Sequence, residues 1–214
     1  MPDLSFHVES AEAEPFAAAP LVVLKLRVAS EPATAAVRGI LLRAQVRIDA
    51  PARRYADAEA AGLRDLFGEP ARWGATLRSL VWTSASLSVP AFEGRVVVDL
   101  PLPCSLDLTV AAAKYFYALE GGEVPLTLLF SGTVFHAGAG GALEAAPVPW
   151  SREAAFRLPV AVWKEAVDRQ FPGAAPFALR RDVFDRLYRL KVARGLATLD
   201  EALESLLPPE GARA

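Results

Sequence analysis

The sequence predicts an α+β protein, a mostly antiparallel β-sandwich followed by a helical C-terminal element, and two observations support this fold class. Over residues 1–150, apolar residues recur mainly at every second position, the period of a strand with one buried face. From about residue 150 the period changes to that of an amphipathic helix. The chain has 214 residues, of which 53% are hydrophobic, enough to bury a sizeable core. We therefore expect a β-sandwich-like domain over residues 1–150 and a helical element over residues 151–208 packed on it.

Two early runs show the strand pattern most clearly. In both, apolar residues occupy every second position, namely Val22, Leu24, Leu26 and Val28 in the first run and Ile40, Leu42, Ala44, Val46 and Ile48 in the second. Charged or polar residues fill most positions between them, which predicts half-buried antiparallel strands. Two later runs repeat the alternation, at Val81, Thr83, Ala85, Leu87 and Val89, and then at Val96, Val98 and Leu100.

Residues 56–76 predict a short helical excursion between the second and third of these runs. Leu63, Leu66 and Phe67 have helical spacing, and Gly68 and Pro70 follow as helix-ending residues. We expect the chain to return to the sheet directly afterwards.

The second half of the sandwich is less regular. Residues 111–119, AAAKYFYAL, either extend the preceding strand or form a short crossover helix, and we favour the helix because two glycines follow these good helix formers. A strongly β-prone run begins at Val124 and contains Gly132. A glycine inside a strand indicates a bulge or the close approach of another backbone. The glycine-rich residues 138–142 predict a hairpin turn.

The C-terminal part predicts amphipathic helices. Their apolar stripes are formed by Val162, Trp163, Ala166 and Val167 in one segment, and by Val183, Phe184, Leu187 and Leu190 in the next. Thr198 and Glu201 have the spacing of a capping box, which predicts the start of a last helix ending at Pro208. We expect the large apolar side chains of these stripes to be buried.

Composition excludes several classes of protein. A formal net charge of −2 gives no global attraction to nucleic acid or to anionic lipid. The single cysteine, Cys104, cannot form an internal disulfide, and we expect it to be buried and structural. The first ten residues show no secretory signal, and the longest apolar runs are shorter than the roughly 20 residues that span a bilayer. We therefore expect a cytoplasmic protein with no membrane span.

The residues needed for common catalytic chemistries are absent or scattered. His7, His136 and Cys104 are far apart and have no metal-ligand spacing. The sequence has no nucleophile elbow, phosphate-binding loop or dinucleotide fingerprint. Carboxylates at 99, 107, 120 and 123 could converge for acid–base work, although acidic residues at strand ends usually face water. We expect a non-enzymatic protein that needs no metal or cofactor.

The segment 180–194 is the one strongly basic stretch, with six positive and two negative residues. It predicts either a surface for an acidic partner or nucleic acid, or an ordinary solvated helix face with ion pairs four residues apart. The acidic residues after Thr198 would repel phosphate, so we expect no nucleic-acid binding. For a protein partner, the predicted contact residues are Arg181, Arg189, Lys191 and Arg194.

Aromatic residues gather between Lys114 and Phe171, where the sandwich is expected to meet the helices. They predict an ordinary core, since large rings fill the gaps between a sheet and its helices. The alternative is a binding groove or a partner interface at the same place.

Four stretches also resemble a known family. Taken in order, they are LRDLFGEPARWGATLRSLVW, VDLPLPCSLDLTVAAAKYFYALEGGEVPLTLLFSGTVFH, RLPVAVWKEAVDRQFPG and LRRDVFDRLYRLK. Together they resemble an uncharacterised family of bacterial proteins of about this length, a domain of unknown function. Such proteins look like companions of high-affinity nickel-iron uptake hydrogenases of the actinobacterial type. The resemblance implies a biological setting and provides no catalytic residues.

From the residues and the resemblance together, we expect an accessory, assembly or scaffolding protein that binds another protein. The resemblance implies that the partner is a hydrogenase subunit or maturation factor. The alternative is a small-molecule or peptide-binding module with a pocket between the sheet and the C-terminal helices.

Overall fold

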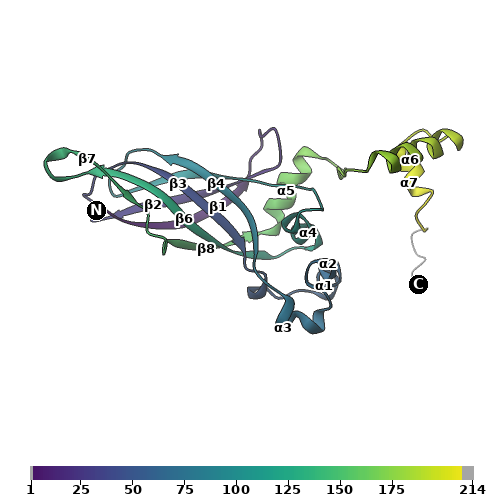
Figure 1. The fold of residues 1–214 in the computed structure, drawn as a ribbon, viewed down its shortest axis with the longest axis horizontal. Coiled ribbons are helices and arrows are strands. Elements are labelled where there is room, and N and C mark those ends of the chain that lie inside the picture. The colour runs from purple at the N-terminus through teal and green to yellow at the C-terminus, as the bar shows by residue number, and fades with distance from the viewer. Residues whose placement is uncertain (1, 209–214) are drawn as a thin grey trace. The chain divides into compact units, whose positions relative to one another are not determined.

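The computed structural model describes residues 2–208 and shows an α+β protein with two antiparallel sheets and a C-terminal helical element, as the sequence predicts. The chain divides into two compact units, residues 1–176 and residues 177–214. The first unit contains the sheets, and Figure 1 shows its long strands running side by side with helices at one end. No helix in the described part of the chain is both long and apolar enough to cross a membrane.

Two sheets form the sandwich of the first unit. The three-stranded sheet has the order β1 (Asp3–Ala13), β2 (Leu21–Glu31) and β5 (Arg95–Pro103). The second sheet has the order β4 (Leu80–Val89), β3 (Val37–Ile48), β6 (Glu123–Ala137) and β7 (Leu143–Pro147), and β8 (Glu153–Pro159) also pairs with β6. Strand β6 is long enough for β8 to pair with its first half and β7 with its last residues.

The core lies between the two sheets and follows the predicted alternation. All nine apolar residues predicted to face inward on β2 and β3 are buried. Phe6 of β1 and Phe130 of β6 stack with ring centroids 4.2 Å apart, which joins the two sheets. Burying one such large side chain stabilises the fold by about 1.5–3 kcal/mol.

Gly132 is the point of closest approach between β6 and β3. A Cβ placed on this glycine would lie 2.0 Å from the carbonyl oxygen of Leu41, and its φ is +145°. The predicted close approach of another backbone is therefore confirmed, because any side chain here would overlap β3.

Strand β4 differs from the prediction at its beginning. Val81 was expected on the buried face with Thr83 and Ala85, but it is 57% exposed. The register between β3 and β4 shifts where Val46 pairs with Thr83 and Arg47 pairs with Val81, leaving Trp82 as an extra residue. This bulge reverses the alternation, so Trp82 packs against the core and Val81 faces outward.

Short helices fill the predicted excursion. They are α1 (Asp57–Gly62), α2 (Arg64–Phe67) and α3 (Trp73–Thr76), with 3-10 turns η1 (Ala50–Ala52) before them and η2 (Pro70–Arg72) among them. Residues 111–118 form helix α4 (Ala111–Ala118), so the crossover-helix interpretation is confirmed. The predicted hairpin turn contains a third 3-10 turn, η3 (Ala139–Gly141).

The region after residue 150 begins differently from the expectation. We predicted a helical element from residue 151, yet β8 occupies residues 153–159. Ala154 and Leu158 are buried and Arg157 between them is exposed, which is a strand pattern too short to stand out before the helical period that follows. Helix α5 (Val160–Gln170) comes next and belongs to the first unit, where Trp163 stacks on Phe116 at 5.1 Å.

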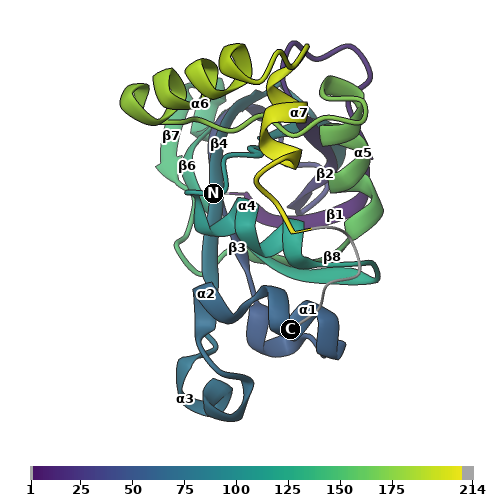
Figure 2. The ribbon, with the colours of Figure 1, turned by 90° about the vertical axis from the view of Figure 1, so that its right-hand side faces the viewer.

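The second unit contains α6 (Arg181–Ala193) and α7 (Leu199–Glu204), both visible in Figure 2. The last helix was expected to run to Pro208 but ends at Glu204. The packing of residues 177–208 on the sandwich stays a prediction.

Candidate protein-binding surface in the C-terminal unit

The end of α6 and the start of α7 each have a clear stop or capping signal. Gly195, with φ +66°, ends α6 in the left-handed conformation that glycine adopts at low cost. The Thr198 hydroxyl accepts a hydrogen bond from the amide of Glu201 (3.1 Å), and the Glu201 carboxylate accepts one from the amide of Ala197 (2.8 Å). The predicted cap at Thr198 is confirmed, with its return bond reaching one residue earlier than in the usual capping box.

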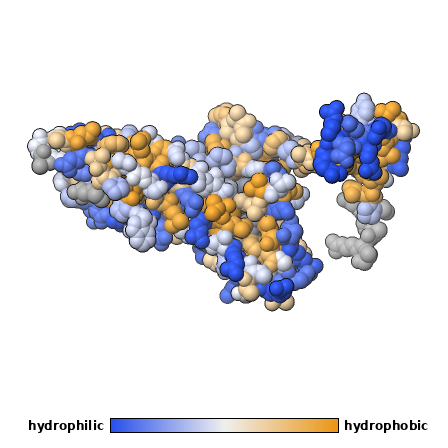
Figure 3. Space-filling view, in the orientation of Figure 1, coloured by the Kyte–Doolittle hydropathy of each residue, from blue (hydrophilic) through white to orange (hydrophobic). Residues whose placement is uncertain are grey.

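This unit buries few of its apolar residues. Among residues 177–208, only Leu187 and Ala202 are buried. Large side chains such as Phe177 (64% exposed) and Leu207 (65% exposed) remain accessible. Figure 3 shows strongly hydrophilic residues beside hydrophobic ones on these helices. The apolar residues here do not form a closed core of their own.

One exposed apolar stripe follows α6 on the side formed by Phe184, Tyr188 and Val192, which we call the aromatic stripe. The three side chains are 37%, 51% and 62% exposed, and spacings of four residues place them on one helix face. The Phe184 and Tyr188 rings stack with centroids 6.4 Å apart. The ammonium group of Lys191 lies 5.9 Å from the centroid of Tyr188, within cation–π range.

Sequence reasoning missed this stripe because it grouped Phe184 with Val183, Leu187 and Leu190. Of those four, only Leu187 is buried. The signal was present in the sequence, since Phe184, Tyr188 and Val192 repeat at intervals of four. When a helix has two neighbouring apolar stripes, a residue of the weaker stripe can be assigned to the stronger one, as happened with Phe184.

The four predicted contact residues lie at different places on α6. Arg181 is at its first turn and makes an exposed ion pair with Asp185 (3.1 Å). Arg194 follows its last turn and donates a hydrogen bond to the Ser205 hydroxyl (2.8 Å). They are 13 positions apart in the sequence, or about 20 Å along the helix at 1.5 Å per residue.

Lys191 and Arg189 differ in their relation to the aromatic stripe. Lys191 is half-buried beside Tyr188. Arg189 is exposed, and its Cα lies about 100° around the helix axis from that of Tyr188. The structure therefore places Arg181 one turn before Phe184 in the row of the stripe and Lys191 beside Tyr188, whereas Arg189 and Arg194 lie further around the helix. The roles of all four residues in partner binding stay predictions.

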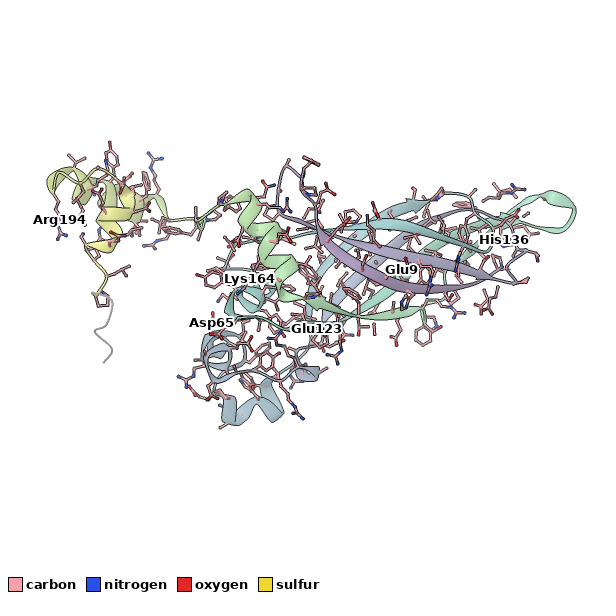
Figure 4. All side chains as sticks on the ribbon, turned by 180° about the vertical axis from the view of Figure 1, so that it is seen from behind. Glu9, Asp65, Glu123, His136, Lys164 and Arg194 are labelled. Atoms are coloured by element: carbon pink, nitrogen blue, oxygen red, sulfur yellow. The ribbon has the colours of Figure 1, made fainter. Side chains whose placement is uncertain are left out.

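The residues weighed for metal binding and catalysis lie apart. His136 is buried near the end of β6, His7 is exposed on β1, and Cys104 is buried just after β5. Figure 4 shows Glu123 and His136 at opposite ends of the sheet. Within residues 2–208, no group of three or more His, Cys, Asp or Glu is placed to hold a metal. Burial raises the pKa of the Cys104 thiol to about 12.

The first unit also holds a buried polar network that the sequence did not reveal. Arg53 Nη2 donates to the carboxylate of Glu59 (2.6 Å) and to the carbonyl of Gly121 (2.7 Å), and Nη1 donates to the carbonyl of Glu123 (3.0 Å). The side chains of Arg53 and Glu59 are only 8% and 5% exposed. This ion pair fastens the start of the helical excursion to the turn between α4 and β6.

Two tyrosines extend this network toward the core. The Tyr55 hydroxyl donates to the carbonyl of Ala50 (2.8 Å) and lies 2.8 Å from the hydroxyl of Tyr115. Burial, together with the hydrogen bond between the tyrosines, raises the pKa of Tyr115. Because every hydroxyl has a partner, the pair supports the packing of α4 against residues 50–55.

A small cavity of about 250 Å³ lies at the helical end of the first unit. It is lined by Leu106, Tyr117, Trp163, Lys164, Val167, Asp168 and Ala174. Figure 4 places Lys164 at this end, on α5. The Lys164 ammonium group donates a hydrogen bond to the carbonyl of Glu120 (3.2 Å), which fixes its position in the cavity wall.

Comparison with known proteins identifies the family. The model of a family of unknown function (DUF6084) matches residues 1–214. The chain belongs to this family. The resemblance to a domain of unknown function is confirmed, and the connection with hydrogenases stays a prediction.

The other comparisons add little. No curated protein matches the sequence. One crystal structure, of a Bordetella pertussis protein assigned as ApaA, is 14% identical, and the match covers 73% of this chain and 93% of that one with a TM-score of 0.24. A TM-score this low does not establish a shared fold.

Proposed function

We propose that this protein binds another protein through the aromatic stripe of α6, as an accessory or scaffolding component and not as an enzyme. The observation that carries this proposal is the exposure of Phe184, Tyr188 and Val192 in one row. Aromatic residues and arginine are enriched in protein interfaces and often supply most of the binding energy. An exposed apolar row of this kind favours aggregation unless a partner covers it.

The flanking charges define the chemistry of the partner. Arg181 lies about one turn before Phe184 and Lys191 about one turn after Tyr188, so basic residues stand before and after Tyr188 along the helix. The exposed ion pair of Arg181 with Asp185 is weak enough to exchange for a partner carboxylate. The matching surface carries an apolar anchor that inserts beside Tyr188 and acidic residues on both sides of it. Charge of this kind contributes to association rate and orientation, while the stripe contributes affinity.

A component of a nickel-iron hydrogenase, either a subunit or a maturation factor, is the partner that we propose. The support is the family resemblance in the sequence, which implies that such proteins accompany uptake hydrogenases. The test is co-purification from a host that produces the hydrogenase, with wild-type bait compared with a Tyr188→Ala bait and with a Glu204→Ala bait, which changes an exposed residue of α7 outside the stripe.

We expect the wild-type and Glu204→Ala proteins to recover a hydrogenase subunit or maturation factor, and Tyr188→Ala to lose most of it. Recovery of another protein with the same dependence on Tyr188 would retain the protein-binding function and reject the hydrogenase partner. Equal recovery by all three baits would reject the aromatic stripe as the binding surface.

The alternative function is a small-molecule or peptide-binding module that uses the cavity at the helical end of the first unit. Its lining favours this reading, because Trp163 and Tyr117 offer aromatic walls while Lys164 and Asp168 offer polar groups. Native mass spectrometry of the purified full chain would reveal a retained ligand. Loss of that ligand in Trp163→Leu, with retention in Tyr188→Ala, would favour this function over partner binding.

A further inference from the structure

A groove between α6 and α7 provides a second apolar surface, which shares Phe184 with the aromatic stripe but is not bordered by Tyr188 or Val192. It consists of two adjoining hollows of about 410 Å³ each. Leu179, Leu187 and Leu203 border both hollows, so the groove is continuous. Only Leu187 among these three is buried. The groove is therefore an accessible, leucine-rich surface within residues 177–208.

The two sides of this groove carry opposite charge. Arg181 and Arg186 border it on α6, whereas Asp200 borders it on α7. Neither Arg186 nor Asp200 forms an ion pair with another residue in the part of the chain that the structure describes. A partner with only acidic residues around its apolar face would be attracted by α6 and repelled by Asp200.

We infer that a second copy of this chain occupies the groove. A two-fold rotation brings the basic side of one groove against the acidic side of the other, so that Arg186 of each copy faces Asp200 of the other. Each contact then occurs twice, and leucine packs against leucine between them. A second copy thus matches both sides of the groove at once, which a uniformly charged partner does not.

The small core of this unit supports the same occupant. Helical units of fewer than about 40 residues usually need cross-links or association to be stable. Residues 177–208 bury only Leu187 and Ala202, and the one cysteine of the chain, Cys104, lies outside this segment. Joining two copies through the groove supplies the missing apolar contacts. Tyr188 and Val192 of the aromatic stripe do not border the groove and stay free for the partner proposed above.

The first test is the association state of the full chain by sedimentation equilibrium over a range of protein concentrations. We expect a reversible monomer–dimer equilibrium. Leu203→Glu, which places a charge in the groove, should raise the dimer dissociation constant by about tenfold or more. Arg189→Glu changes a residue of α6 that does not border the groove and should leave the constant within about twofold.

A charge exchange between two variants tests the pairing directly. Arg186→Glu places an acidic residue opposite Asp200 of the other copy, and Asp200→Arg places a basic residue opposite Arg186, so each variant alone should dimerise at least about tenfold more weakly. Mixed in equal amounts, the two variants should form a heterodimer with affinity close to wild type. This recovery depends on correct folding of both variants, so unfolding cannot imitate it.

Three results would overturn the inference. A wild-type chain that is monomeric throughout the concentration range has no second copy in the groove. A dimer that Leu203→Glu does not weaken is held together elsewhere. Single variants that do not recover on mixing exclude the pairing of Arg186 with Asp200. None of these results depends on binding by the aromatic stripe, because Tyr188→Ala should leave the dimer intact.

Discussion

Replacement of Glu59 by alanine should destabilise the first unit far more than a typical loss of an acidic residue. The Glu59 carboxylate accepts hydrogen bonds from Arg53 (2.6 Å) and from the amides of Glu120 (3.0 Å) and Ala56 (3.2 Å). The residue is only 4% exposed, so water cannot replace these bonds without local opening. Alanine would leave the guanidinium of Arg53 buried without a counter-charge.

The magnitude follows from that burial. Removing one partner of a buried ion pair costs about 3–5 kcal/mol. In a domain of this size, each 1 kcal/mol lowers the melting temperature by about 2–4 °C, so Glu59→Ala should melt between about 6 and 20 °C below wild type. Thermal unfolding followed by circular dichroism measures this change, and urea unfolding checks it at constant temperature.

Glu165→Ala is the matched control. Glu165 pairs with Arg169 four residues later on α5, and both side chains are about half exposed (50% and 44%). Such exposed pairs contribute less than about 1 kcal/mol, so the melting temperature should change by no more than about 4 °C. The double variant Arg53→Met/Glu59→Leu should be more stable than Glu59→Ala because no buried charge is left alone. If Glu59→Ala melts like Glu165→Ala, the ion pair does not anchor the excursion.

Three further predictions concern the first unit. Gly132→Ala should prevent normal pairing of β3 with β6 and greatly lower the soluble yield, because its Cβ would lie 2.0 Å from the Leu41 carbonyl oxygen; wild-type yield and melting would refute the close approach. Cys104, with a pKa raised to about 12 by burial, should react slowly with a thiol reagent at pH 8 in the native protein and rapidly in denaturant, and fast native labelling would contradict its burial. Burial raises the pKa of Tyr115 in the folded state, so the stability linked to this phenol should be complete below the unfolded pKa of about 10 and decline as pH rises above it. Urea unfolding at pH 8 and pH 11 should show a smaller loss of stability in Tyr115→Phe than in wild type, and equal losses would reject this linkage.

The local sequence pattern determined most of the secondary structure. Alternation on β2 and β3 located their buried faces because a strand presents every second side chain to the same side. Gly132 marked a close backbone approach, and Thr198 marked the start of α7, because both signals act within a few residues. The shared face of Phe184, Tyr188 and Val192 follows from helical spacing alone, although their exposure does not.

Tertiary structure alone decided the features that depend on pairing between distant segments. The bulge that turns Val81 outward is defined by the register of β4 on β3, and β8 is defined by its pairing with β6. Glu59 reads as an ordinary acidic residue in the first turn of a helix, yet it is buried because Arg53 and the amide of Glu120 meet it there. A local pattern shows which side chains share a face, whereas the register between strands and the partner of a buried charge depend on which distant segments fold against each other.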